Sequence, residues 1–326
     1  AGGLSRHLRG GGAVRRGVAR GPRPRTIRVR RRLGRGRGRR NQRRRTRTLE
    51  SDIGDLWQRY RNDRVEDAAD SAVRSTLDAF LDGLETGRIR AAEQVGDTGP
   101  DAWRVNEWVK RGILLNFSLR ETEARKYGGV SYYDVLPLRS TDDLGGRGTR
   151  NTPDGTAIRR GAYLGSDCIM MSPSFVNIGA HVGDGTLVDS CDTVGSCAQL
   201  GEDVKLGANT LIGGVLEPVE DAPVIIEDGV SLGAGCRVTS GFHIGENTVV
   251  GENTLLTPRI PVYDLVTDEI VYGHLPANRR AFTRHVESSL SDHDLFESGA
   301  YKPAVVALDI EDDTLDNTRR EEALRE

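Results

Sequence analysis

One aliphatic position in every six residues dominates the middle of the chain. The position is filled without a break from Ile158 to Ile212, and after a two-residue shift of phase it resumes at Ile226 and runs to Val262. Its 17 occupants, all aliphatic or Met, are Ile158, Leu164, Met170, Val176, Val182, Val188, Val194, Leu200, Leu206, Ile212, Ile226, Leu232, Val238, Ile244, Val250, Leu256 and Val262. An α-helix repeats about every 3.6 residues and a strand every two, so neither element alone has this period. We therefore interpret each hexad as a short strand followed by a turn, with its aliphatic side chain directed into a narrow prism.

Small residues accompany the aliphatic one within each hexad. Glycine follows it directly at most repeats, and a small or modest side chain stands four residues after it, as at Ala180, Thr186 and Ala198. We expect that glycine to adopt the unusual dihedral angles of a turn, and the small side chain to fill the remaining interior. Three hexads close one triangular coil, so the pattern predicts a parallel β-helix of five to six coils. The spacing does not fix the handedness of the coil.

Shorter patterns flank the repeats. Apolar residues recur at helical spacing in two segments before them, and Gly87 is placed as a C-terminal stop for the first. These residues are Val73, Leu77, Phe80, Leu81 and Leu84 in the first segment and Trp108, Val109 and Ile113 in the second. The fold that we predict is mainly β, with a small N-terminal helical (α+β) domain over residues 50–150, a β-helix over residues 151–263 and a short C-terminal β extension over residues 264–326.

Charge divides the chain near residue 50. Residues 1–49 contain 19 Arg and no Asp, Glu or Lys. A basic arm can bind phosphate backbones by releasing counterions, but this one has no aromatic residue to stack on bases, so we expect no nucleic-acid partner. It also lacks the apolar core of a signal peptide and the amphipathic period of a transit peptide. We interpret the segment as a disordered or spurious extension, with a real basic tail as the alternative, and leave it out of the predicted fold.

Residues 50–326 carry the opposite charge. Of the 46 Lys and Arg in the chain 27 remain here, against 48 Asp and Glu, which gives a net charge of −21. Only four of the basic residues are lysines: Lys110, Lys126, Lys205 and Lys302. Such a composition suits the salt-rich cytoplasm of a halophile, where the Debye length falls to roughly 3 Å at 1 M and self-repulsion is screened. An ordinary acidic cytosolic enzyme is the alternative.

Cysteine spacing and hydropathy exclude two classes of protein. The four cysteines, Cys168, Cys191, Cys197 and Cys236, form no CxxC pair, so we expect reduced thiols that are buried or partly buried and neither a disulfide framework nor a metal site. No apolar run approaches the roughly 20 residues of a membrane span, so no membrane partner is expected. The predicted location is cytoplasmic.

Several motifs resemble those of one enzyme family. The segments "PSFVNIGA", "VDSCDTVGSCAQ", "IGGVLEP" and "IIED" inside the repeats are similar to those of tetrahydrodipicolinate N-succinyltransferases, and so are "GRIRAAEQ", "WVKRGILLNFSLRE", "YYDVLPLR" and "YDLVTDEIVYGHLPA" outside them. The resemblance covers the chain from about Glu50 to the C-terminal region. It implies a left-handed β-helix and a homotrimer with its active sites in clefts between neighbouring β-helices.

The activity implied by the resemblance is acyl transfer to an amine. The cosubstrate is succinyl-CoA, and no cofactor is bound permanently. The acceptor is the amine of 2-amino-6-oxopimelate, the ring-opened form of tetrahydrodipicolinate, in the diaminopimelate route to lysine. An amine that attacks a thioester must lose a proton, and the oxyanion that forms needs N–H donors, which a turn-rich backbone supplies.

The resemblance also points to individual residues. Asp189 in "LVDSCD" matches the family position that holds the substrate amine, although Asp in a slot usually filled by Gly is also compatible with a simple turn. A dicarboxylate substrate calls for guanidinium groups. Arg150 matches a substrate-binding arginine of the family if one residue is inserted after Pro153, and Arg159 is the fallback.

Three further positions complete the predicted site. Glu217 lies in the excursion "GGVLEPVEDAP" and is expected to shape the cleft, while Ala234 in "LGAG" matches a position where the CoA arm of the family passes small residues. Arg237 stands where these enzymes often carry a second acid, so the resemblance does not bring a two-carboxylate mechanism to this chain. Arg237 is instead a candidate contact for the succinyl carboxylate or a CoA phosphate.

Cys191 and Asp192, the neighbours of Asp189, stand where the family more often has an aromatic and a small residue. Asp192 falls in an inward slot, where it needs a hydrogen-bond partner.

Two other functions remain open on the sequence. An N-acetyltransferase that uses acetyl-CoA on the same or a related amino-dicarboxylate would differ by one carboxylate on the donor. A zinc-dependent β-helix enzyme would need three converging histidines, but only His181 and His243 lie in the repeat. Both precede aliphatic positions, so we expect them to point outward and to be exposed.

Overall fold

The computed structural model describes residues 37–65, 69–97, 99–127, 130–153, 155–216, 219–293, 295 and 299–310, with side chains from residue 48 onward except those of 291 and 292. The chain divides into two units, residues 1–40 and 41–326. The repeats lie in the second unit.

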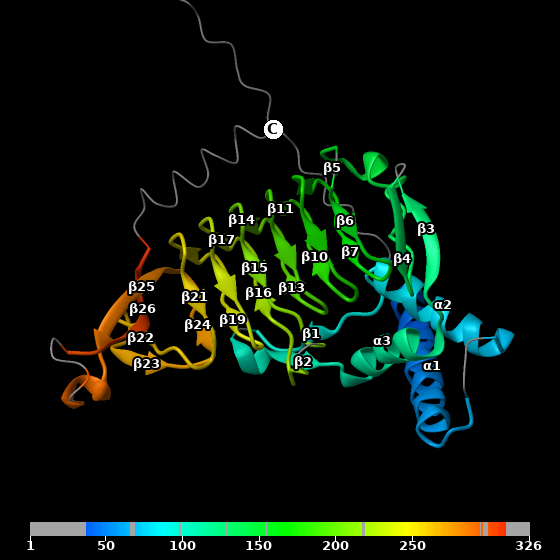
Figure 1. The fold of residues 1–326 in the computed structure, drawn as a ribbon, viewed down its shortest axis with the longest axis horizontal. Helices are drawn as coiled ribbons and strands as arrows, with labels where there is room; N and C mark the ends of the chain where they lie inside the picture. Colours follow the sequence, from blue (N-terminus) through cyan, green and yellow to red (C-terminus); the bar gives the residue numbers. More distant parts are fainter. Residues whose placement is uncertain are drawn as a thin grey trace, which may run out of the picture. The chain divides into compact units, whose positions relative to one another are not determined.

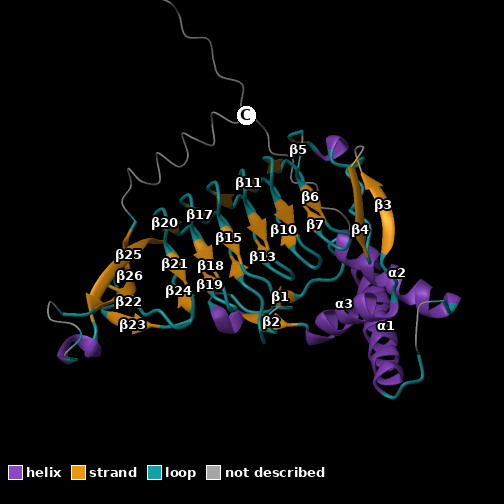
Figure 2. Ribbon diagram, in the orientation of Figure 1, coloured by secondary structure: helices purple, strands orange, loops and turns teal. Residues whose placement is uncertain are grey.

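Three parallel sheets form the predicted β-helix (Figures 1 and 2). Successive two-residue strands alternate among the sheets, and each pairs with a strand one coil further on, as Leu187 does with Lys205. Face A contains β5 (Arg150–Asn151), β8 (Ile169–Met170), β11 (Leu187–Val188), β14 (Lys205–Leu206), β17 (Ser231–Leu232) and β20 (Val249–Val250). Face B contains β6 (Ala157–Ile158), β9 (Phe175–Val176), β12 (Thr193–Val194), β15 (Leu211–Ile212), β18 (Arg237–Val238) and β21 (Leu255–Leu256). Face C contains β7 (Tyr163–Leu164), β10 (His181–Val182), β13 (Gln199–Leu200), β16 (Ile225–Ile226), β19 (His243–Ile244) and β24 (His274–Leu275).

The predicted aliphatic positions fill the prism. All 17 of them are at most 2% exposed, and together they form one continuous hydrophobic cluster. A two-residue strand has too few hydrogen bonds and too little apolar surface to be stable alone, so each coil depends on the coils above and below it. The six-residue period is thereby confirmed as a β-helix.

The glycine that follows each aliphatic residue has a different role from the predicted one. The left-handed backbone conformation belongs to the residue two places later, as at Gly185 (φ 72°) and Cys191 (φ 65°), and not to Gly183. A Cβ atom on Gly183 would lie 2.1 Å from the carbonyl oxygen of Gly201 in the next coil. Glycine at this position therefore lets successive coils stack closely, and the expected turn dihedral at this position is wrong.

The N-terminal domain combines three helices with two hairpins. Its elements are α1 (Arg37–Arg61), α2 (Ser71–Glu85), α3 (Glu107–Leu119), β1 (Ala92–Gln94) with β2 (Trp103–Val105), and β3 (Glu123–Tyr127) with β4 (Val130–Asp134). The two predicted helical segments are confirmed as α2 and α3, and the apolar face of α2 is buried. Helix α1 begins at Arg37, inside the arginine-rich segment, and the rest of that segment lies outside the described residues.

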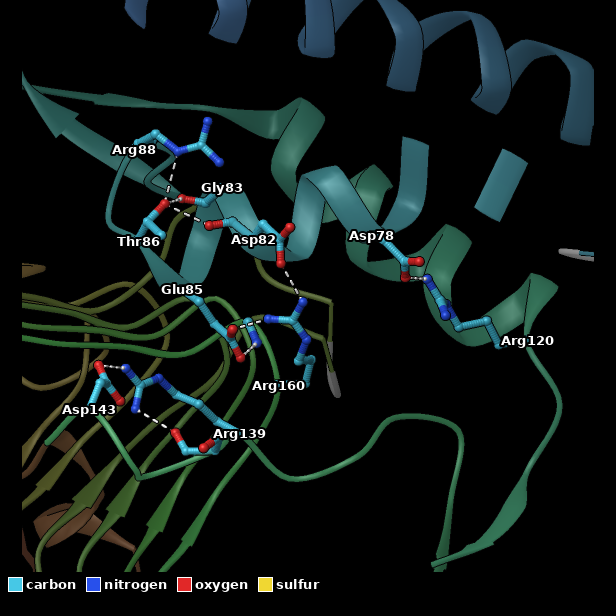
Figure 3. Close-up of polar contacts among 12 residues, drawn as sticks. Asp78, Asp82, Gly83, Glu85, Thr86, Arg88, Arg120, Arg139, Asp143 and Arg160 are labelled. Atoms are coloured by element: carbon cyan, nitrogen blue, oxygen red, sulfur yellow. Dashed lines mark hydrogen bonds and ion pairs between the residues drawn. The ribbon is translucent and has the colours of Figure 1, made fainter. Parts of the chain in front are cut away.

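Packing and ion pairs fasten this domain to the β-helix. Its hydrophobic cluster extends onto Ile178, Cys197 and Val215 of the coils. Arg160, in the turn after β6, donates hydrogen bonds to Asp82 and Glu85 of α2 (Figure 3). The domain is therefore held against the first coils at the B/C edge of the prism.

The hairpin β1–β2 covers part of face C. Arg90 donates from Nε to Oε1 of Gln199 at 2.9 Å, and Trp103 donates from Nε1 to Oε1 of Glu227 at 2.9 Å. His243 lies 3.0 Å from the same oxygen and is 4% exposed. His181 and His243 thus stand on the outer side of the prism as expected, but the expectation that they are exposed is wrong because other parts of the chain cover them: His243 is buried and His181 is only partly exposed.

The C-terminal β extension continues face A. After β22 (Val262–Asp264) and β23 (Glu269–Val271), the long strand β25 (Arg279–Glu287) pairs in parallel with β20 and antiparallel with β26 (Tyr301–Asp309). Short 3₁₀ turns occur at Pro100–Ala102, Gly145–Arg147 and Ser289–Asp292. The predicted extension is confirmed, and it lengthens one face of the prism beyond the last hexad.

Close stacking of the coils can be tested with one methyl group. We expect Gly183→Ala to lower the free energy of unfolding by about 1–3 kcal/mol, because the added Cβ atom meets backbone that cannot move aside. Gly146→Ala is the matched control, since a Cβ atom there meets nothing within 4 Å. Urea unfolding at one fixed protein concentration measures both variants. Equal stability of the two would contradict the role assigned to the glycine.

Candidate functional site

An open groove of about 800 Å³ follows the outer side of face A. The strand register places two parallel rows of residues along it. The outward residues of the strands form the first row: Leu187, Lys205, Ser231, Val249 and Arg280. The second row consists of the residues that directly follow the inward residue of each strand: Asp189, Gly207, Gly233, Gly251 and Phe282. The second row is thus a strip of glycine with a carboxylate at one end and an aromatic ring at the other.

The length and chemistry of this groove fit an extended ligand. Four strand spacings separate Asp189 from Phe282, which is about 19 Å. The glycines remove side chains that would block the close approach of a ligand to the backbone. Arg280 and Arg284 line the far end, where the guanidinium of Arg284 lies 4.2 Å from the ring centre of Phe282. The groove therefore has Asp189 at one end and Arg280 and Arg284 at the other, with Lys205 and Glu252 between them.

Asp189 is half-buried at the edge between faces A and B. Its Oδ1 accepts the N–H of Ser190 at 2.7 Å, and within the described residues its Oδ2 accepts no hydrogen bond. Asp189 does not have a positive φ, but it occupies the first position of a turn in which the N–H of Asp192 donates to its carbonyl at 3.3 Å, so the structure is compatible with the turn interpretation as well as with the functional one. Asp189 lines the groove, and a carboxylate that can accept a proton or a hydrogen bond is what an attacking amine requires.

The two unusual neighbours of Asp189 differ sharply in exposure. Cys191 has φ 65° and is exposed, which corrects the expectation that all four thiols are at least partly buried. Asp192 is 1% exposed in the predicted inward slot, and its two carboxylate oxygens accept the N–H groups of Asp189 at 2.6 Å and Thr210 at 2.7 Å. The need for a partner at Asp192 is thereby confirmed.

Three of the remaining predicted residues lie near this edge. Arg150 is exposed on β5, two strands before β11 on face A, at a distance of roughly 10 Å along the prism. Ala234 is exposed next to Gly233 of the glycine row. Arg237 is exposed on β18, just past the same A/B edge, and its Nη1 donates to the carbonyl of Gly235 at 2.9 Å. The structure thus brings Asp189, Ala234 and Arg237 together within three neighbouring coils.

The fifth predicted residue, Glu217, lies outside the described residues. The described part of its excursion leaves the prism after β15, at the B/C edge, where Val215 packs into the cluster of the N-terminal domain. Lys110 of α3 also donates to the carbonyl of Glu220 at 2.8 Å. Within one chain the excursion therefore begins and ends on a different edge from Asp189. Arg159, the fallback for Arg150, is already paired with Asp134 at 2.5 Å.

A smaller cavity of about 290 Å³ lies between the hairpin β1–β2 and face C. Burial, with the nearby charge of Arg90, lowers the pKa of His181 to about 2, so this imidazole is neutral. Burial alone would raise the pKa of Glu227, but hydrogen bonds from His243 and Trp103 bring it below its ordinary value. Glu227 bonds both Trp103 and His243 and so joins the domain to the prism, whereas the buried Nδ1 atoms of His181 and His243 have no hydrogen-bond partner among the described residues.

Metal-binding clusters and membrane-spanning helices are both absent from the part of the chain that the structure describes. No group of three His, Cys, Asp or Glu side chains there is arranged to hold a metal ion. None of the helices in that part is long and apolar enough to span a bilayer.

The groove contains functional candidates that the sequence argument missed. Lys205, Arg280 and Arg284 all line it. The sequence could have predicted Lys205, because it directly precedes an aliphatic position. It must therefore face outward beside Leu187, with which it pairs. Arg280 and Arg284 follow the last hexad, and only the pairing of β25 with β20 places them on face A.

Comparisons with known proteins cover most of the chain. Residues 48–119 match the family described as "Tetrahydrodipicolinate N-succinyltransferase N-terminal", and residues 223–258 match "Hexapeptide repeat of succinyl-transferase". The 2,3,4,5-tetrahydropyridine-2,6-dicarboxylate N-succinyltransferase of Xylella fastidiosa strain Temecula1 is 36% identical over 282 residues, which cover 85% of this chain and 98% of that protein. The protein of the same name from Polynucleobacter asymbioticus is 37% identical, with the same coverage of both chains. The hexapeptide-repeat match is consistent with the predicted left-handed coil.

Proposed function

The chain belongs to the tetrahydrodipicolinate N-succinyltransferase family, and from that premise we propose that it transfers a succinyl group from succinyl-CoA to the amine of 2-amino-6-oxopimelate in lysine biosynthesis. The observation that carries the proposal is the carboxylate of Asp189 at one end of the glycine row. A groove of this shape accommodates a long cosubstrate whose reactive end lies beside an acid.

The CoA arm is assigned to the groove on face A. Pantetheine is a narrow, extended chain with amide groups, and the backbone exposed at Gly207, Gly233 and Gly251 can approach it without interference from side chains. Ala234 lies beside this row, as the family resemblance implies. Arg280 and Arg284 supply cations for the CoA phosphates at the end remote from Asp189.

In this proposal Asp189 binds and deprotonates the attacking amine. Its Oδ2 accepts a hydrogen bond from the substrate ammonium and then takes the proton that the amine must lose before it attacks the thioester carbonyl. The carbonyl carbon becomes tetrahedral, and the C–S bond to CoA breaks as the nitrogen loses its second proton to solvent and the amide forms. Asp189 then gives the proton it took to the leaving CoA thiolate. Backbone N–H groups of the A/B edge are the donors available for the oxyanion.

In this proposal two arginines near Asp189 bind the carboxylates of the acceptor and of the succinyl group. Arg150 and Arg237 are both exposed and lie on either side of Asp189 along the prism, so one can bind the acceptor dicarboxylate and the other the free carboxylate of the succinyl group. An acetyl donor would leave the second arginine unpaired. The named relatives are succinyltransferases, so the acetyltransferase alternative is not favoured.

We propose a homotrimer packed through face B. The outward row of that face includes Phe175, Leu211 and Leu255, of which the two leucines are 36% and 39% exposed. Face B is flanked by the A/B edge, which carries Asp189, and by the B/C edge, from which the excursion with Glu217 departs. Packing of three B faces around one axis would bring the excursion of one subunit to the Asp189 edge of the next, where Glu217 would shape the cleft.

The nature of the donor and the role of Asp189 can be tested together. We expect kcat/KM to be about 10- to 100-fold higher with succinyl-CoA than with acetyl-CoA, because one charge-assisted hydrogen bond is lost with acetyl. Asp189→Asn should lower kcat with succinyl-CoA by about 10²- to 10⁴-fold, since the amide cannot accept the proton. Asp268→Asn, an exposed turn residue of the β22–β23 hairpin, is the control. Full activity in Asp189→Asn would overturn the assignment.

The CoA assignment predicts a change in KM. In the double variant Arg280→Ala/Arg284→Ala we expect KM for succinyl-CoA to rise by at least about tenfold, with kcat much less affected, because the phosphates lose their cations while the reacting atoms do not. Arg111→Ala on α3 removes another exposed arginine, outside the groove, and should leave KM unchanged. Steady-state kinetics decide between the groove and another CoA path: an unchanged KM in the double variant rejects the groove.

A cytoplasm of high salt is proposed from the charge of residues 50–326. Both substrates are anions that approach a net charge of −21, so their long-range repulsion weakens as the Debye length falls from about 10 Å at 0.1 M to about 3 Å at 1 M. We therefore expect kcat/KM to rise with KCl up to molar concentration. Initial rates over a salt series measure this, and a steady loss of activity above ordinary ionic strength would count against it.

A further inference from the structure

The interior of the A/B edge differs most from that of the B/C edge, whereas the C/A edge is mixed and holds Cys168, Thr186 and Thr248 beside Val204 and Val230. The inward corner slots of the A/B edge are mostly polar, being occupied by Thr156, Ser174, Asp192, Thr210, Cys236 and Thr254. The corner slots at the B/C edge include Ala162, Ala180 and Ala198. Among the inward slots of the described coils, Asp192 is the one charged side chain. It lies three residues after Asp189, and its side chain accepts the backbone N–H of Asp189.

The carboxylate of Asp192 interrupts the regular ladder of hydrogen bonds. At Met171, Gly183 and Gly207 the backbone N–H donates to the carbonyl of the inward residue one coil further on. The equivalent N–H of Asp189 instead donates to Oδ2 of Asp192 at 2.6 Å. The contact thus departs from the pattern of the prism at the residue assigned to catalysis.

The same carboxylate also joins two coils. Its Oδ1 accepts the N–H of Thr210 at 2.7 Å, from the slot stacked on Asp192 in the next coil. The N–H of Asp192 in turn donates to the carbonyl of Asp189 at 3.3 Å. The bond to the carbonyl is the turn contact that other coils also make, as Cys236 does with Gly233, whereas the bond to the N–H of Asp189 comes from the Asp192 carboxylate, which is itself anchored to the following coil.

We propose that Asp192 is a positioning residue for acyl transfer: its carboxylate holds the backbone of Asp189 so that the Asp189 side chain lies in the groove. This inference rests on the proposed function of Asp189. Asp192 touches neither substrate nor CoA in this assignment, because its side chain points into the prism. It acts through the orientation of Asp189.

Ionisation of Asp192 follows from its surroundings. Burial raises its pKa to about 7 in spite of the two N–H donors, and the neighbouring charge of Asp189 adds to the rise. The slots stacked on either side hold Ser174 and Thr210, which do not titrate in this range, and Cys191 lies beside it on the same turn. Above that pH the carboxylate accepts both N–H groups. Below it, the added proton turns one oxygen into a donor that faces an N–H, so one contact is lost.

Substitutions at this slot can keep the fold and remove the carboxylate. Asp192→Ser and Asp192→Thr copy the residues that fill the slot in the preceding and following coils, Ser174 and Thr210. We expect either variant to lower kcat/KM at pH 8 by about 10- to 100-fold, because a small misplacement of a catalytic group has an effect of that size. In the wild type, kcat/KM should fall as the pH drops through about 7, and this step should be absent from both variants.

A second buried aspartate supplies the matched control. Asp264 is 1% exposed and accepts hydrogen bonds from Arg279 and the N–H of Val266, outside the groove. Asp264→Asn should lower the melting temperature and leave the pH profile of kcat/KM as in the wild type. This separates loss of a buried carboxylate in general from loss of the one behind Asp189.

The outcomes distinguish the two proposals. If Asp189→Asn is inactive while Asp192→Ser has wild-type kcat/KM, the positioning role fails and the proposed function stands. If Asp192→Ser loses activity but keeps the step near pH 7, Asp192 is only structural and the inference is overturned. If Asp189→Asn keeps its activity, the role of Asp189 in the proposed function fails, and the inference that depends on it falls too.

Discussion

The stack of inward aliphatic side chains is the interaction on which everything else in this protein depends. A strand of two residues has almost no stability of its own, yet burial of each Val, Leu or Ile contributes about 1.5–3 kcal/mol. Because the same position recurs every six residues, the side chains from successive coils form one continuous column. The glycines beside them allow the coils to approach closely enough for the backbone ladder to close.

This regularity makes departures from it informative. A prism of identical coils presents three similar faces, so function has to arise where one edge differs. At the A/B edge one inward slot holds the carboxylate of Asp192, and Asp189 stands in the slot that is glycine in the following coils. The backbone N–H of Asp189 donates to Asp192 and not to the next coil. Along face A the same glycine slot stays empty of side chains for three strands and forms a channel. The same six-residue repeat thus forms both the rigid prism and the groove along face A.

Electrostatics act locally in this molecule. The body of the chain is strongly acidic, whereas the proposed substrates are anions, so general attraction cannot bring them together. The cations that line the groove come from separate parts of the sequence: Lys205 from a hexad and Arg280 and Arg284 from the C-terminal extension. The extension therefore does more than end the prism, because it contributes the basic end of the groove.

The sequence by itself determined the β-helix, its phase shift, the two helices α2 and α3, and the family, because period, spacing and motif are properties of neighbouring residues. It also singled out Asp189 and the inward position of Asp192. It did not determine why glycine follows the aliphatic residue, that His243 is buried, or that Arg280 meets the groove. Each of these depends on contacts between residues far apart in the chain: coil against coil, hairpin against face C, and β25 against β20. Only the tertiary structure brings such segments together, since the register between them is set by packing and not by the local pattern.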